Sequence, residues 1–260
     1  MWSEGYVCSS PEDLECALAD VLFLSKQNGT FVMYYAATAV DHPRKHCIGA
    51  ATSENVEGPY TPISTSIACP LVQGGAIDPS GFTDIDGKTY VVYKVDGNSL
   101  DKGRICVRKL KPSKHFIPRP TPLMLQALAS DSVTPLGDPV QLLDREEGDG
   151  PLIEAPSLVR SKDGKYILFF SSNCFDTPLY DVAYATSDHV AGPYVRAARP
   201  FLKTGMGPGL KGPGGAAVTP DGSKLVFHGI LGQATNKLAK LTRGMYTANI
   251  EIKDASVILT

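Results

Sequence analysis

The stretch SLVRSKDGKYILFFS, residues Ser157–Ser171, decides the fold class. Two apolar runs flank Asp163-Gly164. An Asp-Gly pair between apolar runs is a strong hairpin signal, because both residues tolerate the positive φ of a type I′ turn. The second run, Tyr166–Phe170, is rich in the aromatic and β-branched residues that favour strands. The stretch therefore predicts a β-hairpin with a tight turn.

The same design occurs three more times along the chain. An apolar run, a turn with glycine and a second apolar run are found at Val21–Ala36, Gly81–Val95 and Ala216–Gly229. The four turn glycines are 58, 77 and 58 residues apart, at Gly29, Gly87, Gly164 and Gly222. This spacing indicates four copies of one structural unit.

A second repeated sequence supports the division into similar units. Residues 51–60, ATSENVEGPY, match residues 185–194, ATSDHVAGPY, at seven of ten positions. Self-similar units of several short strands are typical of a β-propeller. A β-sandwich is the alternative, but it would not need the same turn every 58 residues. Met245–Ile250 and Ala255–Leu259 alternate like an outer strand of the last unit. Between the second and third hairpins, Lys111–Gly137 is interpreted as a Pro-rich loop.

Composition favours one all-β domain over residues 1–260. The chain has 43% hydrophobic residues, 25 glycines, 20 prolines and a net charge of −2. That balance gives no basic surplus for nucleic acid or an anionic membrane, so neither is expected as a partner. The longest apolar runs are too short to cross a bilayer.

The N-terminal region and the cysteines leave two questions open. The start, Met1–Gly5, lacks the features of a signal peptide. About 20 residues precede the first unit, too few for another blade, so we expect an N-terminally truncated domain. The six cysteines have no metal-finger spacing, and both disulfides and buried free thiols are compatible with them.

Two carboxylates stand out for their surroundings. Asp78 and Glu154 lie among small, apolar and proline residues, just ahead of a predicted hairpin. The innermost strands of a propeller line its channel, so both could face one ligand. Burial would raise the pKa of a carboxyl, as a general acid near neutral pH requires. The alternative is that both cap turns or accept backbone N–H groups.

Several motifs together resemble glycoside hydrolase family 43, which contains arabinanases, α-L-arabinofuranosidases and β-xylosidases. They are Ala76–Phe82 with Asp86-Gly87, Ile153–Leu158, Tyr184–Ser187 with Gly192–Tyr194, and Gly212–Gly215. The resemblance covers the chain from about Ala19 to its end. It implies a five-bladed β-propeller, of which about four blades are present here, and hydrolysis with inversion by three carboxylates.

The resemblance assigns roles to two of these carboxylates. Glu154 matches the general acid, and Asp78 matches the aspartate that orients the acid and raises its pKa. The base aspartate, which lies in the family's first blade, has no matching position. Asp20 resembles the aspartate at the entry of the second blade, which is not the base. An inverting enzyme needs the base to activate water, so we expect the chain to be inactive or nearly so.

Four further residues are candidates for binding sugar. Arg243 matches a family arginine that bonds sugar hydroxyls, although a surface salt bridge is the alternative. His228 could face the channel or be a satisfied core histidine. Asn173 and Phe175 follow the third hairpin and could edge the pocket. Where related arabinanases have Gly-Pro-Gly-His, whose histidine helps to hold a channel metal in some members, this chain has Gly212–Gly215. We therefore expect no metal and no cofactor.

The resemblance predicts a glycosidase acting on arabinose- or xylose-containing plant polysaccharides: arabinan, arabinoxylan or xylan. It also implies a secreted protein, which we expect to be a monomer. A carbohydrate-binding pseudoenzyme is the second interpretation, and a propeller used for protein interaction is a third.

Overall fold

A computed structural model describes residues 5–6, 18–27, 29–101, 106, 119–231 and 242–260. Cys8 and Cys16 lie outside the described residues. Within the described part, no helix has the length and apolar character needed to span a bilayer. The chain divides into two compact units, Met1–Gly103 with Leu123–Gln141, and Arg104–Pro122 with Leu142–Thr260. Each unit is described by itself.

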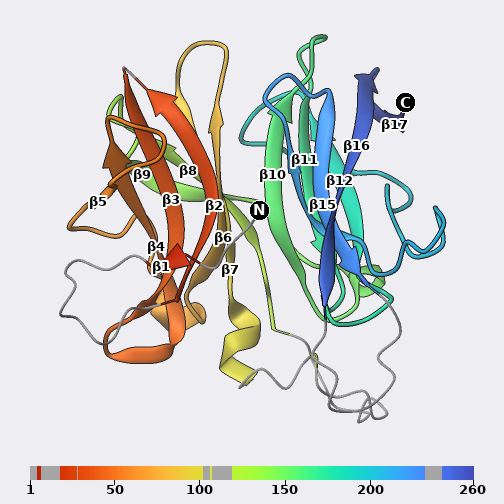
Figure 1. Ribbon diagram of the computed structural model, residues 1–260, viewed down its shortest axis with the longest axis horizontal. Helices are drawn as coiled ribbons and strands as arrows, with labels where there is room; N and C mark the ends of the chain where they lie inside the picture. The colour runs from red at the N-terminus through yellow and green to blue at the C-terminus, as the bar shows by residue number, and fades with distance from the viewer. Residues whose placement is uncertain (1–4, 7–17, 28, 102–105, 107–118, 232–241) are drawn as a thin grey trace. The chain divides into compact units, whose positions relative to one another are not determined.

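The first unit holds two antiparallel sheets and two short 3-10 helices (Figure 1). The first sheet has the order β1-β2-β3-β4-β5, with β1 Gly5–Tyr6, β2 Leu18–Gln27, β3 Thr30–Ala39, β4 His42–Ser53 and β5 Thr61–Pro62. The second has the order β6-β7-β8-β9, with β6 Ala76–Thr83, β7 Thr89–Val95, β8 Leu123–Leu128 and β9 Pro135–Leu143. The 3-10 helices are η1 Leu71–Gln73 and η2 Gly97–Asp101.

The second unit also holds two antiparallel sheets. One has the order β10-β11-β12-β13, with β10 Ile153–Arg160, β11 Tyr166–Ser172, β12 Asp181–Ser187 and β13 Val195–Arg196. The other has the order β14-β15-β16-β17, with β14 Gly214–Val218, β15 Lys224–Ile230, β16 Arg243–Lys253 and β17 Ser256–Leu259. A 3-10 helix, η3 Glu147–Asp149, precedes β10.

All four predicted hairpins are present, and the all-β class is confirmed. They are β2–β3, β6–β7, β10–β11 and β14–β15. Three of these hairpins are the first two strands of their sheet, and β2–β3 is preceded in its sheet by β1. Every sheet pairs its strands in chain order, which is the up-and-down topology of a propeller blade. The predicted outer strand of the last unit is confirmed as β16 and β17.

The type I′ turns predicted from the three Asp-Gly pairs are wrong, whereas Asn28 of the fourth turn lies outside the described residues. In the turn before β7, Gly87 donates its N–H to the Asp84 carbonyl, so the reversal spans four residues. Gly87 has φ +81°, whereas Asp86 has no positive φ. Asp86 instead accepts the Lys88 N–H through its carboxylate. Because only the glycine takes the left-handed conformation, this is a longer turn that closes on glycine.

The interpretation of Lys111–Gly137 as a loop is also wrong in part. Residues Leu123–Leu128 form β8, which pairs with β7 along its whole length. Leu123, Leu125 and Leu128 are buried. This strand lacks a flanking Gly turn of the repeated type, so tertiary burial rather than local turn chemistry places it in the sheet.

The sequence echo at residues 51–60 and 185–194 corresponds to one repeated turn. The Tyr60 hydroxyl donates to the Val56 carbonyl, and the Tyr194 hydroxyl donates to the Val190 carbonyl, both at 3.0 Å. Gly58 and Gly192 have φ near +90°. The seven shared residues therefore encode the same local structure after β4 in the first unit and after β12 in the second.

Each unit has its own apolar core between its two sheets. In the first, Val32 and Ile48 pack with Val91 and Tyr93. In the second, Ile167 and Phe169 pack with Leu225 and others. β14 contacts β10, β11 and β12, so the cores hold the innermost strands of neighbouring sheets together within a unit. This packing positions the candidate site in the second unit.

Candidate active site

A β-bulge interrupts the innermost strand in both units where the candidate carboxylates lie. In β10 the register shifts between Glu154 and Ser157, and Ala155 has φ +52°. In β6 it shifts between Ile77 and Ser80, and Asp78 itself has φ +56°. A non-glycine residue in the left-handed region is uncommon and is concentrated at functional sites. Bulges re-aim side chains, and they do so here at both candidate positions.

The bulges show that the two carboxylates are not equivalent within the repeat. Asp78 aligns with Ala155, because each is the left-handed residue before Pro-Ser. Glu154 is therefore one position earlier than Asp78. Asp78 belongs to the first unit and Glu154 to the second, so their convergence on one cavity stays a prediction.

Glu154 has a specific hydrogen-bonding partner. The Tyr180 hydroxyl donates to Glu154 Oε1 at 2.8 Å. Tyr180 directly precedes β12 and is only 2% exposed, whereas Glu154 is half-buried. One oxygen of the Glu154 carboxyl therefore accepts a hydrogen bond from a buried hydroxyl. Tyr180 was not a candidate from the sequence.

Arg243 lies in the same cluster as Glu154. Its Nε donates to His228 Nδ1 at 2.5 Å, and its Nη2 donates to the Gly212 carbonyl at 2.6 Å. Nη1 donates to the Phe175 carbonyl. The guanidinium carbon lies 5.2 Å from the centre of the Tyr180 ring, in cation–π range. These contacts fix the guanidinium in place, and the surface salt bridge considered for it is not what holds it.

His228 completes the cluster as a neutral ring. It stacks on Tyr180, with ring centres 6.2 Å apart and planes 12° apart. Burial, and then the charge of Arg243, lower the pKa of His228 to about 4, although Glu154 opposes this shift. Because Nδ1 accepts from a permanently charged guanidinium, the ring hydrogen is on Nε2.

Two glycines make room for these rings. A Cβ on Gly214 would lie 2.0 Å from Tyr180 Cε1, and a Cβ on Gly215 would lie 2.3 Å from His228 Nε2. Both residues are in Gly212–Gly215, the segment where the family resemblance would have Gly-Pro-Gly-His. The backbone at Gly215 also donates its N–H to Ser171 Oγ at 2.9 Å. The glycine pair therefore forms a wall against which Tyr180 and His228 pack.

The residues of this cluster do not fit the metal ion that some members of the resembled family hold in their channel. Gly215 has no side chain that could ligate a metal ion, and His228 Nδ1 already accepts from the Arg243 guanidinium. A cation would also be repelled by Arg243, which lies in contact with the imidazole.

Asn173 and Phe175 have different surroundings. The Asn173 N–H donates to the carbonyls of Asp149 and Leu152, and a Cβ on Gly150 would lie 2.3 Å from the Asn173 side-chain oxygen. Asn173 has φ +66° and is committed to its own loop. Phe175 is 49% exposed, while its carbonyl accepts from Arg243. Phe175 is therefore linked to the Glu154 cluster through its backbone.

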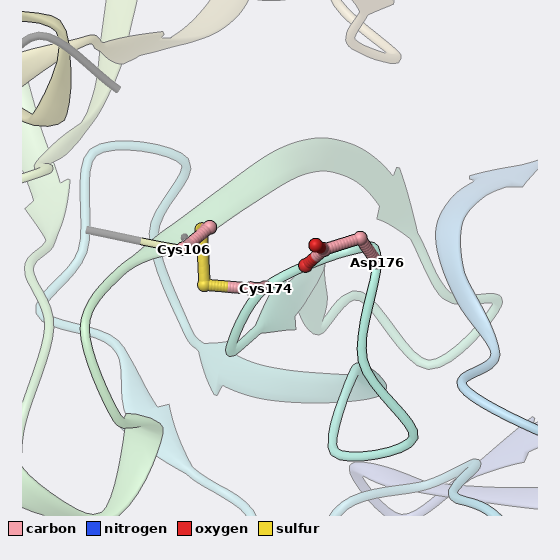
Figure 2. Close-up of side chains that lie close together, drawn as sticks. All are labelled: Cys106, Cys174 and Asp176. Atoms are coloured by element: carbon pink, nitrogen blue, oxygen red, sulfur yellow. A yellow bond between two sulfur atoms is a disulfide. The ribbon is translucent and has the colours of Figure 1, made fainter. Parts of the chain in front are cut away.

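A disulfide joins this loop to a distant segment. Cys174 is bonded to Cys106, 68 residues away, and Asp176 lies beside the two sulfurs (Figure 2). Sulfurs bonded to each other are not thiolate ligands, so these three side chains do not make a metal site while the bond is present. A second disulfide, Cys47–Cys69, lies in the first unit. Of the two cysteine states left open by the sequence, these four are disulfide-bonded.

We expect His228 to remain neutral down to about pH 5, because its pKa is lowered to about 4. In ¹⁵N NMR spectra of the full chain, its ring signals should be those of the Nε2–H tautomer from pH 8 to pH 5. His228→Gln assigns the signals. Arg243→Gln removes the neighbouring charge and should move the His228 titration to higher pH. A wild-type ring that titrates above pH 6 would contradict the cluster's geometry.

Asp181, next to Tyr180, should make stability depend on pH. Burial, partly offset by hydrogen bonds from Ser172, raises its pKa from 3.8 to about 6. An acid with a raised folded-state pKa costs stability once ionised, so stability falls between about pH 4 and pH 6. Asp181→Asn should be more stable than wild type by about 3 kcal/mol above pH 6 and equal to it below pH 4.

Urea unfolding at pH 7.5 and pH 3.8 measures this difference for Asp181→Asn. Asp138→Asn, at an exposed position in β9, is the matched control and should leave stability nearly unchanged at both pH values. A pH-independent effect of Asp181→Asn would show that burial of the charge is not its cause.

Comparisons with known proteins agree with the fold. The model for glycosyl hydrolases family 43 matches residues 21–256. A thermostable family-43 glycoside hydrolase has 24% identity and a TM-score of 0.70, over 91% of this chain and 72% of that one. An endo-1,4-beta-xylanase from Bacteroides thetaiotaomicron has 25% identity and a TM-score of 0.67, over 94% and 74%.

An alpha-L-arabinofuranosidase from Lactobacillus brevis has 17% identity and a TM-score of 0.65, over 91% of this chain and 74% of that one. At such identities the likeness of solved structures concerns the fold. No curated protein matches the chain.

Proposed function

Since the chain belongs to the glycosyl hydrolases of family 43, we propose that it acts on O-glycosidic bonds of arabinose- or xylose-containing plant polysaccharides, with Glu154 as general acid. The observation that carries the proposal is the Glu154 carboxyl on a bulged inner strand, bonded by Tyr180 beside Arg243. Related structures include an arabinofuranosidase and a xylanase, which supports this substrate class.

The proposed chemistry starts with proton transfer. Glu154 gives its proton to the leaving glycosidic oxygen as the bond from that oxygen to the anomeric carbon breaks. Arg243 and the Nε2–H of His228 donate to sugar hydroxyls. Asp78 lies near the acid in this proposal, where a like charge favours keeping the proton on Glu154. Water then attacks the opposite face, which inverts the anomeric carbon.

The attacking water needs a base, and no residue of the chain matches the family's base aspartate. We therefore propose that hydrolysis by the 260-residue chain is slow. A fifth blade, as the family resemblance implies, would bring the base. The unmatched base also favours a second candidate function, a protein that binds sugar in its channel without cleaving it.

Azide separates these candidates, because it attacks the anomeric carbon without a base to deprotonate it. The test combines calorimetric binding of arabino- and xylo-oligosaccharides with assays of their cleavage, with and without azide. Binding, slow hydrolysis and an inverted glycosyl azide would support the glycosidase. Binding with no cleavage under either condition would support the sugar-binding protein. No binding of any of these sugars would contradict both.

We further infer that the protein acts outside the cell. The Cys47–Cys69 and Cys106–Cys174 disulfides support this, because such bonds persist in oxidising compartments. Proteomic detection in culture supernatant, compared with the cell lysate of the source organism, tests it. Retention of the protein in the reduced cytosolic fraction would contradict it.

A further inference from the structure

We propose that Tyr180 is a positioning residue, which holds the Glu154 carboxyl by its Oε1 so that the acid carries its proton on Oε2. The proposal deepens the function proposed above and rests on it. Its basis is the hydrogen bond of 2.8 Å from the Tyr180 hydroxyl to Glu154 Oε1. An oxygen that accepts this hydrogen is the less favourable site for the acid's own proton, so the hydrogen bond favours Oε2 as the protonated oxygen.

The Tyr180 ring is fixed on several sides. Gly214 lies against its edge, where any side chain would collide with Cε1. His228 stacks on the ring, and the Arg243 guanidinium lies 5.2 Å from its centre. With the ring buried and clamped in this way, the hydroxyl has little freedom to leave the carboxyl. Such support from the surrounding shell is what gives an acid one defined orientation.

The clamp comes from segments that are distant in sequence. Tyr180 precedes β12, His228 is on β15, Arg243 begins β16 and Gly214 begins β14. These elements also supply three titratable groups that interact with Glu154: Tyr180, His228 and Arg243. Of the three, Tyr180 is the one whose hydroxyl bonds a carboxyl oxygen directly. Removing that hydroxyl while keeping the ring therefore isolates its contribution.

A simpler explanation is that Tyr180 is a core tyrosine whose hydroxyl uses Glu154 as a convenient acceptor. The two explanations differ in what happens to the carboxyl. A donor to the ionised form favours that form. If Tyr180 controls Glu154, loss of the hydroxyl moves the titration of the carboxyl to higher pH. If it only fills space, the ring suffices and the titration does not move.

The experiment is a ¹³C NMR titration of the full chain labelled at the glutamate carboxyl carbon. Glu154→Gln identifies the Glu154 signal. In Tyr180→Phe we expect the midpoint to rise by about half to one pH unit, as for loss of one hydrogen bond. Tyr34→Phe is the matched control. In the wild type, the buried Tyr34 hydroxyl donates to the Ser132 carbonyl, and both residues belong to the first unit, whereas Glu154 belongs to the second. This control variant should leave the midpoint unchanged.

A second variant keeps the test decisive if Tyr180→Phe does not fold. Replacing Tyr180 by 3-fluorotyrosine keeps the ring and makes the hydroxyl a stronger donor, so the midpoint should fall. An unchanged Glu154 midpoint in the folded Tyr180 variants, or an equal shift in Tyr34→Phe, would overturn the proposal. The titration needs no substrate, so its failure is distinguishable from a failure of the proposed glycosidase function.

Discussion

Replacing Glu154 by glutamine is expected to lower kcat on arabino- or xylo-oligosaccharides by about 10²–10⁴-fold, the usual contribution of a general acid. Glutamine keeps the size of the side chain and can still accept from Tyr180, but it has no proton to give. A sugar alkoxide is a poor leaving group, so the loss of its proton donor slows cleavage of the glycosidic bond. Initial rates with azide as nucleophile, at saturating substrate, measure the effect.

The leaving group supplies the control for Glu154→Gln. A 2,4-dinitrophenyl glycoside of the same sugar leaves without protonation, so its cleavage should be reduced far less. Glu251→Gln, at an exposed position of β16 in the same unit, should behave like wild type with both substrates. Equal losses on the good and poor leaving groups would show that Glu154 does not act as the acid.

Removing the Cys106–Cys174 disulfide is expected to cost about 4 kcal/mol of unfolding free energy. The bond closes a loop of 68 residues, and the chain-entropy model gives about this value for that length. Cys174 also precedes Phe175, whose carbonyl accepts from Arg243. The double variant Cys106→Ala with Cys174→Ala should therefore both lose stability and bind sugar more weakly, by urea unfolding and calorimetry.

The Cys47–Cys69 bond is a matched control for that experiment. It closes only 22 residues and lies in the first unit, so its removal should cost about 1 kcal/mol less than the other and leave the Arg243 contacts intact. Reductant should abolish the stability difference between wild type and each double variant. Equal loss of sugar binding in both variants would contradict the link between Cys174 and the site.

Strand pairing could be predicted from the sequence wherever turn chemistry repeated. Gly87, Gly164 and Gly222 each close a turn with φ near +70° to +90°, and each lies between two paired strands as expected. β8 could not be predicted, because its pairing depends on the burial of Leu123 and Leu125 in the folded protein, and no turn motif beside it indicates a strand. The type of turn was also missed, since the conformation of the Asp before each glycine follows from loop length.

The sequence identifies three residues of the candidate site. Glu154 and Arg243 carry a family motif, His228 lies near the end of a predicted strand, and the structure brings the three together. Tyr180 was missed because its role depends on an absent Cβ at Gly214, 34 positions later, and on a bulge in β10. Neither a missing side chain nor a register shift leaves a periodic pattern, so such contacts become visible only in three dimensions.

We propose that Asp78 and Glu154 serve one bound sugar. A crystal structure of the Glu154→Gln chain with an arabino- or xylo-oligosaccharide tests this proposal. We predict that residue 154 contacts the glycosidic oxygen, with the Asp78 carboxylate beside it in the same cavity. Sugar bound far from residue 154, or an Asp78 side chain that opens onto a different surface, would contradict the claim.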